Sequence, residues 1–216
     1  MSTVLFLSKK NDPRCELALA LLREHFPGVT AAMGEWGTPF PAHLLDWSGE
    51  FIISYLSRWV VPAPLLARAA GAAINFHPGP PEYPGFGCYN FALYENAAAY
   101  GVTCHHMQQR VDSGAIVAVR RFPIQPCGDV ASLLEKTHDA LLALFSEIIS
   151  TIVRNDPLPV SSETWTRPPF RKTQLEELHR ITPGMTREEI ARRTRAVTMG
   201  KWRPFIELHG HRFIHD

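Results

Sequence analysis

The stretch AAINFHPGPPEYPGFGCYNFALYENAAAYGVTCHHMQQRVDSGAIV, residues 72–117, decides how this sequence is interpreted. It starts with a short apolar run that is typical of a buried strand, and the run ends at Asn75, Phe76 and His77. A loop with four prolines and three glycines comes next. A strand that served only to fill a core would have no need of an amide and an imidazole at its end. The stretch therefore indicates a functional site as well as a fold.

Outside this stretch, strand-length apolar runs alternate with segments of helical periodicity. The expected strands are residues 3–8, 51–56, 72–76, 102–108 and 114–124. The expected helices are residues 14–26, 61–71, 89–101 and a long one that begins after Asp129 and runs to about residue 152. This alternation predicts an α/β fold with a mostly parallel sheet flanked by helices.

The sequence changes character near residue 155. A segment rich in Pro, Ser and Thr follows, and its Trp165 and Phe170 indicate contact with another part of the protein. Thr186, with Glu189 three residues later, predicts a capping box at the start of a helix. Residues 202–216 predict a β-hairpin with a His-Gly turn. The expected units are a main domain, residues 1–155, and a C-terminal extension with a short helix and the hairpin, residues 156–216.

Composition and charge exclude several kinds of protein. The 22 basic and 21 acidic residues give a formal net charge of +1, which does not predict binding to nucleic acid or to an anionic membrane. The apolar run near the N-terminus is shorter than a signal peptide, and no transmembrane run is present, so a cytoplasmic location is expected. The four cysteines lack CxxC spacing and are expected to be free, buried thiols: Cys15, Cys88, Cys104 and Cys127.

Polar side chains at two predicted strand ends suggest a catalytic site. Open parallel sheets bind ligands at the carboxyl ends of their strands, which is where Asn75 and His77 lie. Because they are two residues apart, both point to one side of the strand, and Phe76 points to the other. Asp112 follows a later strand that contains His105, and a carboxylate there can orient an imidazole or carry a proton. An amide, an imidazole and a carboxylate together suit acyl transfer to an amine.

These motifs carry a family resemblance. The pattern N-x-H-P, a Pro/Gly loop, G-V-T-x-H and then D-x-G-x-I, seven residues beyond that histidine, resembles the folate-dependent formyltransferase family. The resemblance covers roughly residues 1–150 and implies a Rossmann-like fold. It also implies that Asn75, His77 and Asp112 are the catalytic trio and that His105 matches the second histidine of the family. Within the family, the sequence is most similar to nucleotide-sugar N-formyltransferases, which formylate the 4-amino group of a dideoxy sugar destined for surface polysaccharide.

The resemblance implies two small-molecule ligands, 10-formyltetrahydrofolate as formyl donor and a nucleotide-linked 4-amino-4,6-dideoxy sugar as acceptor, and we expect a homodimer. The residues expected at the pterin pocket are Ser54, Leu56, Trp59, Val60, Gln108 and Val111. The residues expected to contact the acceptor are Lys9, Lys10, Gly79, Tyr83 and His105. Better-known members have Ser-Leu-Leu-Pro where this chain has Gly-Pro-Pro-Glu after N-x-H-P, which argues against aminoacyl and ribonucleotide acceptors. The segment after residue 155 is also shorter than the second barrel domain expected of a methionyl-tRNA formyltransferase.

Other interpretations stay open at this point. Lys9 and Lys10 either approach a diphosphate or are simply solvated. Trp59 either lines the pterin pocket or packs against the helix after it, and Trp202 with the hairpin could form a dimer contact or a shelf for a nucleotide base. No four-ligand spacing typical of a zinc site is present, so no metal is expected. The same trio could also serve a formyltetrahydrofolate hydrolase, which admits water in place of the amine, and the third class is a non-catalytic folate or sugar-nucleotide binding protein.

Overall fold

The computed structural model describes residues 3–125 and 128–214, so Cys127 lies outside the described residues. Its main feature is a six-stranded sheet with the order β2-β1-β3-β4-β5-β6. The strands are β1 (Thr3–Lys9), β2 (Gly28–Gly34), β3 (Gly49–Tyr55), β4 (Ala69–His77), β5 (Ala99–His106) and β6 (Ile116–Pro123). The pairs β1–β2, β1–β3 and β3–β4 are parallel, and β5 pairs antiparallel with both β4 and β6. The predicted α/β fold with a mostly parallel sheet is confirmed.

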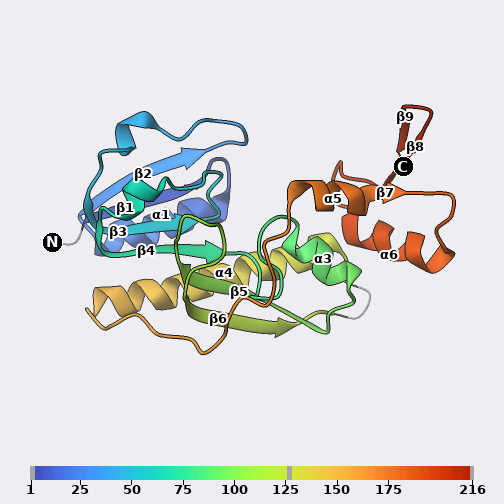
Figure 1. The fold of residues 1–216 in the computed structure, drawn as a ribbon. Coiled ribbons are helices and arrows are strands. Elements are labelled where there is room, and N and C mark those ends of the chain that lie inside the picture. The colour runs from blue at the N-terminus through green and yellow to red at the C-terminus, as the bar shows by residue number, and fades with distance from the viewer. Residues whose placement is uncertain (1–2, 126–127, 215–216) are drawn as a thin grey trace.

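Two long helices, α1 (Pro13–His25) and α4 (Val130–Val153), cover one face of the sheet (Figure 1). On this face the ring of Phe145 lies 4.9 Å from that of Phe76 and 5.1 Å from that of Tyr55, all fully buried. The other face is covered by the 3-10 helix η1 (Ala42–Leu44) and the single-turn helix α2 (Ala63–Leu66). The helix predicted after Asp129 is confirmed, since the Asp129 carboxylate accepts the Ser132 N–H at 2.8 Å.

Two predicted helices were too long. Residues 61–71 were expected to be helical, but α2 ends at Leu66 and β4 begins at Ala69. Residues 89–101 were expected to be helical, but α3 (Cys88–Tyr94) ends early and Ala99 already belongs to β5. In both cases the alanines favour a helix locally, and hydrogen bonds to a neighbouring strand override that preference. The prediction also missed β2, which is composed mostly of small residues, and the helix α5 (Lys172–His179).

The C-terminal elements form a second, small sheet. It consists of β7 (Arg180–Ile181), β8 (Phe205–Leu208) and β9 (His211–Ile214), and the helix α6 (Arg187–Val197) lies beside it. The predicted hairpin is confirmed, and its two turn residues have positive φ, 49° at His209 and 78° at Gly210, as a tight two-residue turn requires. Thr186 caps α6 through the Glu189 N–H as predicted, but the Glu189 carboxylate bonds the Arg193 guanidinium rather than completing the capping box.

The C-terminal elements dock against α3, at the end of the molecule away from the N-terminus (Figure 1). The buried Asn90 side chain of α3 donates to the Ala196 carbonyl of α6 at 2.7 Å. Of the cysteines, Cys15, Cys88 and Cys104 are free and buried, as predicted. Within the described part of the chain, no helix has both the length and the apolar character to cross a membrane.

Candidate active site

The site is built at the carboxyl end of β4. Asn75 and His77 share one side of this strand, and Phe76 points the other way into the aromatic core, as the two-residue period requires. The neighbouring strand β5 is antiparallel, so it brings His105 directly opposite Asn75. The polar side chains predicted at two separate strand ends therefore form one continuous cluster.

Asp112 holds this cluster together from the turn between β5 and β6. One carboxylate oxygen lies 3.2 Å from Nδ1 of His77, and the other lies 3.2 Å from Nε2 of His105. The Gly85 N–H also donates to Asp112 at 2.8 Å. Asp112 has a φ of 45°, a left-handed conformation that is strained for most residues and tolerated by Asp. This backbone conformation places a single carboxylate between two imidazole rings.

The surroundings keep the Asp112 carboxyl ionised although it is only 4% exposed. Desolvation by burial raises its pKa. The electrostatic effect of His77, the hydrogen bond from His105 and the Gly85 N–H lower the pKa by more than burial raises it, to about 2. Asp112 is consequently a fixed negative charge at neutral pH, in contact with both rings.

Both nitrogens of His77 face hydrogen-bond acceptors. Nε2 lies 3.0 Å from the backbone carbonyl of Tyr83, and Nδ1 faces Asp112. The ring of His77 is therefore held in place through both of its nitrogens.

His105 can switch its hydrogen-bonding role. Its Nδ1 lies 2.9 Å from the His106 carbonyl, so that nitrogen carries a proton. Its Nε2 lies 3.1 Å from the Asn75 amide nitrogen and 3.2 Å from Asp112. A neutral ring accepts the hydrogen bond of Asn75, and a protonated ring donates to Asp112 instead. His105 thus couples the amide to the carboxylate.

A residue outside the predicted site covers the histidines. The indole of Trp165 meets both rings edge-on, with centroid distances of 5.8 Å to His77 and 5.0 Å to His105, and its N–H donates to the Gly114 carbonyl at 2.8 Å. The segment 161–170 that carries it, here called the strap, crosses the Pro/Gly loop. Strap backbone bonds join Thr166 to Pro81 and Phe170 to Pro84. The apolar Trp in a polar segment was the sequence signal for this contact, but its partner could not be inferred.

The residues expected at the pterin pocket are spread along the edge of the sheet. Ser54 is buried and pairs with Asn75 across β3 and β4, and Leu56 follows at the end of β3. Gln108 and the exposed Val111 lie in the turn that precedes Asp112. Val60 is also exposed. These positions remain predictions as folate contacts.

Trp59 packs over the face of the sheet that carries Asn75, in the cluster that includes Ile52 and Ala73. Its ring packs against Phe40 at a centroid distance of 5.8 Å and covers Gly34, where a Cβ would come within 2.4 Å of it. Its indole N–H donates to the Thr38 carbonyl at 3.0 Å. In this structure Trp59 braces the loop after β2.

The residues expected to contact the acceptor differ in their surroundings. Lys9 is paired with Asp12 at 2.6 Å, whereas Lys10 is exposed and lies 3.9 Å from Glu35. Gly79 lies against the His77 ring, since a Cβ there would lie 2.6 Å from Nε2 of His77. Tyr83 reaches His77 through its carbonyl, and its hydroxyl donates to Glu95.

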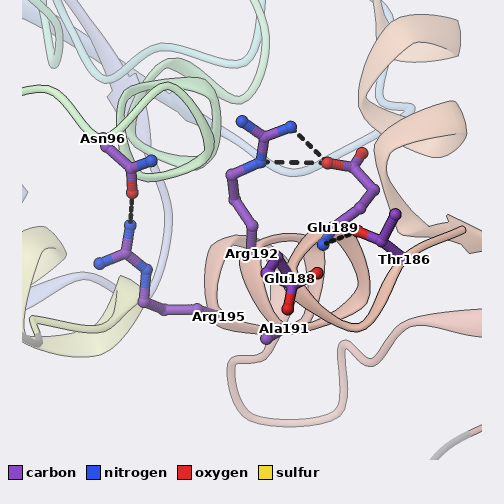
Figure 2. A pocket seen from close by; sticks show the side chains of 7 residues that line it. All are labelled: Asn96, Thr186, Glu188, Glu189, Ala191, Arg192 and Arg195. Carbon is purple, nitrogen blue, oxygen red and sulfur yellow. Dashed lines mark hydrogen bonds and ion pairs between the residues drawn. The ribbon is translucent and has the colours of Figure 1, made fainter.

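A separate cavity lies beside α6, away from the trio. Its volume is about 510 Å³, and Figure 2 shows that Arg192 and Arg195 project into it from α6. Both of its arginines are already bonded, Arg192 to Glu189 and Arg195 to the Asn96 side chain. The chemistry at Asp112 carries more weight than the size of this cavity, so we assign the site to the trio. In residues 3–125 and 128–214, no three His, Cys, Asp or Glu side chains are arranged to hold a metal ion.

Comparison with known proteins agrees with the geometry. A family model described as formyl transferase matches residues 43–149, which include the whole trio. A methionyl-tRNA formyltransferase of Levilactobacillus brevis is 25% identical over 174 residues, 80% of this chain and 54% of that protein. The chain thus spans about half the length of the curated relatives that align with most of it.

Solved structures share the fold over nearly the whole chain. A sugar N-formyltransferase of a Shewanella species superimposes with a TM-score of 0.79 at 17% identity, covering 99% of this chain and 96% of that one. An N-formyltransferase of Helicobacter canadensis, solved with folinic acid and dTDP-3-aminofucose, gives a TM-score of 0.70 at 19% identity, covering 91% and 80%. The family model and the motifs at the site together show that this chain belongs to the formyl transferase family.

Proposed function

We propose that the protein transfers a formyl group from 10-formyltetrahydrofolate to the amino group of a nucleotide-linked 4-amino-4,6-dideoxy sugar. The observation that supports this reaction is the Asp112 carboxylate held between two imidazoles beside the Asn75 amide. A carboxylate, two rings and an amide on one edge supply both oxyanion donors and a route for a proton.

10-Formyltetrahydrofolate, when bound, supplies an electrophilic formyl carbon. The Asn75 amide donates to the formyl oxygen as negative charge develops on it. The amine loses one proton as it bonds to the formyl carbon, and the nitrogen that leaves must gain one. We assign this transfer to His77, whose ring accepts the proton of the amine and returns it to the leaving nitrogen, while the Asp112 carboxylate stabilises the ring that carries it. His105 holds Asn75 in place for this role.

The sugar-nucleotide acceptor is inferred from two sources. The relatives that match over their full length include a sugar N-formyltransferase, and the Helicobacter enzyme binds folinic acid together with a dTDP-linked amino sugar. The near-neutral charge of the chain does not favour a transfer RNA acceptor. We extend the proposal to a role in surface polysaccharide synthesis, a cytoplasmic location and a homodimer.

The test is a product assay with purified protein, 10-formyltetrahydrofolate and a panel of dTDP- and GDP-linked 4-amino sugars. We expect one sugar to gain a formyl group, seen by mass spectrometry, with one tetrahydrofolate formed per product. Asp112→Asn should lower kcat/KM by about two to four orders of magnitude, the usual range for proton-transfer groups. The matched control is Asp156→Asn, which removes an exposed carboxylate paired only with Arg154.

Two results would contradict the proposal. Release of formate at the same rate with and without a sugar would identify a hydrolase. A near-normal rate for Asp112→Asn would remove this carboxylate from the mechanism.

A further inference from the structure

Thr103, the threonine of the G-V-T-x-H pattern, lies directly opposite His77 in the antiparallel pair of β5 with β4. Residues that face each other in such a pair carry their side chains on the same side of the sheet, with Cβ atoms about 5 Å apart. The Thr103 side chain is fully buried, and its hydroxyl donates to the Gly79 carbonyl at 2.8 Å. Thr103 therefore lies beside His77 and bonds the chain two residues after it.

The backbone that Thr103 holds borders the ring of His77. A Cβ at Gly79 would lie 2.6 Å from Nε2 of His77 and 2.9 Å from the Tyr83 carbonyl oxygen, and both separations are shorter than a real Cβ contact. The φ of Gly79 is outside the left-handed region, so glycine is needed here because of space and not because of backbone conformation. The ring thus rests against the peptide at Gly79, with no room for a side chain between them.

Two further buried donors fix the same stretch of backbone. The Tyr100 hydroxyl donates to the Pro78 carbonyl at 2.9 Å, and the Cys88 thiol donates to the same oxygen at 3.2 Å. Burial raises the pKa of the Cys88 thiol to about 11, so the thiol keeps the proton that it donates at neutral pH. Moving this backbone would leave buried donors without acceptors, which is costly. The peptide at Gly79 is therefore a fixed boundary for the ring.

Thr137 provides a contrast, because it is also fully buried and its hydroxyl also bonds a carbonyl. That acceptor is the carbonyl of Leu133, one turn earlier in α4, at 2.7 Å. The bond lies within a single helix and reaches no member of the trio. The bond of Thr103 instead joins β5 to the Pro/Gly loop, at the point where the loop borders His77.

We infer that Thr103 is a positioning residue for His77. Its hydroxyl fixes the Gly79 carbonyl, and the Gly79 peptide stops the ring where Nδ1 faces Asp112 and Nε2 faces the Tyr83 carbonyl. Thr103 acts through the backbone and not on the substrate. The kinetic consequence rests on the proposed function, because His77 is the residue assigned to the proton transfer. The position of the ring does not depend on that function and can be measured in the protein alone.

Crystal structures of the substrate-free wild type, Thr103→Val and Thr103→Ser test the position of the ring. Valine has nearly the shape of threonine and lacks the hydroxyl, whereas serine keeps it. In Thr103→Val we expect the Gly79 carbonyl to turn away from position 103 and Nε2 of His77 to lie beyond hydrogen-bond distance, about 3.5 Å, from the Tyr83 carbonyl. In Thr103→Ser both contacts should remain. A His77 ring that keeps its wild-type position in Thr103→Val would overturn the inference.

Steady-state kinetics test whether this position matters for formyl transfer. Thr103→Val should lower kcat about ten- to a hundredfold with KM within about twofold, because a small misplacement of a reacting group is costly. Thr103→Ser should keep most of the rate. Thr137→Val is the matched control, since it loses a buried hydrogen bond of the same kind, and we expect a lower free energy of unfolding with a wild-type kcat. A loss of kcat that Thr103→Ser or Thr137→Val shares would overturn the inference, because packing or stability would then account for it.

If Thr103→Val does not fold, Gly79→Ala tests the same contact from the other side. Its added Cβ occupies the space of the ring, so kcat should fall at least as far as expected for Thr103→Val, and an unchanged kcat would overturn the inference. If the ring moves as expected and the wild type formylates no amino sugar, the proposed reaction fails and the positioning by Thr103 stands. If Thr103→Val formylates a sugar as fast as the wild type, the positioning fails and the reaction stands.

Discussion

Trp165 is the residue that most changes the description of the site. The trio came from two strand ends, but the rings of His77 and His105 are held in place by an indole that comes from the strap. The indole is itself fixed by its hydrogen bond to Gly114, two residues after Asp112. A side chain anchored beside the carboxylate and touching both imidazoles is a positioning residue.

We predict that Trp165→Leu lowers kcat about ten- to a hundredfold with little change in KM, because small displacements of catalytic groups are costly. Trp165→Phe should keep the edge-on contact and lose less. Steady-state kinetics across pH provide the measurement, and the acid limb of kcat/KM should move in Trp165→Leu, since the ring environment changes. Thr164→Ala is the control on the same strap. An unchanged pH profile with a lowered rate would mean that Trp165 acts only on stability.

At the scale of an element, the Pro/Gly loop and the strap act as one unit. Gly85 pairs with Phe170 as a single bridge between the two segments, and Gly85 also donates to Asp112. Phe170 stacks on Phe91 of α3 at a centroid distance of 3.8 Å, with the rings nearly parallel. The strap thus connects the Asp112 carboxylate to the core under α3.

Gly85 is the point where this unit is least tolerant of change. Its φ is +85°, and a Cβ would lie 2.4 Å from the Phe170 carbonyl oxygen. Gly85→Ala should therefore lower the free energy of unfolding by about 2 kcal/mol through backbone strain, and it should lower kcat by displacing the N–H that bonds Asp112. Urea melts and steady-state kinetics measure the two effects. Gly184→Ala is the control, since a Cβ at Gly184 contacts nothing within 4 Å. Equal stability of both variants would show that the loop relaxes without cost.

For the whole molecule, the docking of α4 on the sheet buries a histidine and should therefore make stability depend on pH. His138 of α4 is buried, 7% exposed. Desolvation lowers its pKa to about 4, and the charge of Lys9 lowers it too, although Asp12 opposes this effect. The ring is therefore neutral in the folded protein at pH values where it is charged in the unfolded chain.

The sign of the resulting effect is fixed by proton binding. Between about pH 6.5 and pH 4 the unfolded state binds more protons at His138, so stability falls as the pH falls through this window. The wild type should lose on the order of 3 kcal/mol there, a loss that His138→Gln should not show. Urea melts at several pH values give the free energy of unfolding of both proteins. The carboxyl groups titrate alike in both, so their contribution cancels when the two free energies are subtracted. The exposed His25→Gln variant should follow the wild type. A His138→Gln curve parallel to that of the wild type would contradict the assignment.

Local patterns in the sequence were sufficient for much of the fold. The two-residue period of β4 put Asn75 and His77 on one side, Asp129 started α4, and the His-Gly turn made the C-terminal hairpin. Each of these depends on neighbours within a few residues along the chain. The predicted helix ends were wrong where tertiary contacts compete with local preference. The alanines at the start of β4 and at the start of β5 belong to those strands and do not extend the preceding helices.

The sequence by itself determined the fold class and the family and predicted the trio, because strand ends, caps and motif spacing are properties of short segments. Only the tertiary structure decided that one carboxylate lies between two imidazoles, that Trp165 covers them, and that Thr103 holds the Gly79 carbonyl. These contacts join segments far apart in the chain, and their partners are chosen by the packing of the sheet, which no short stretch of sequence encodes.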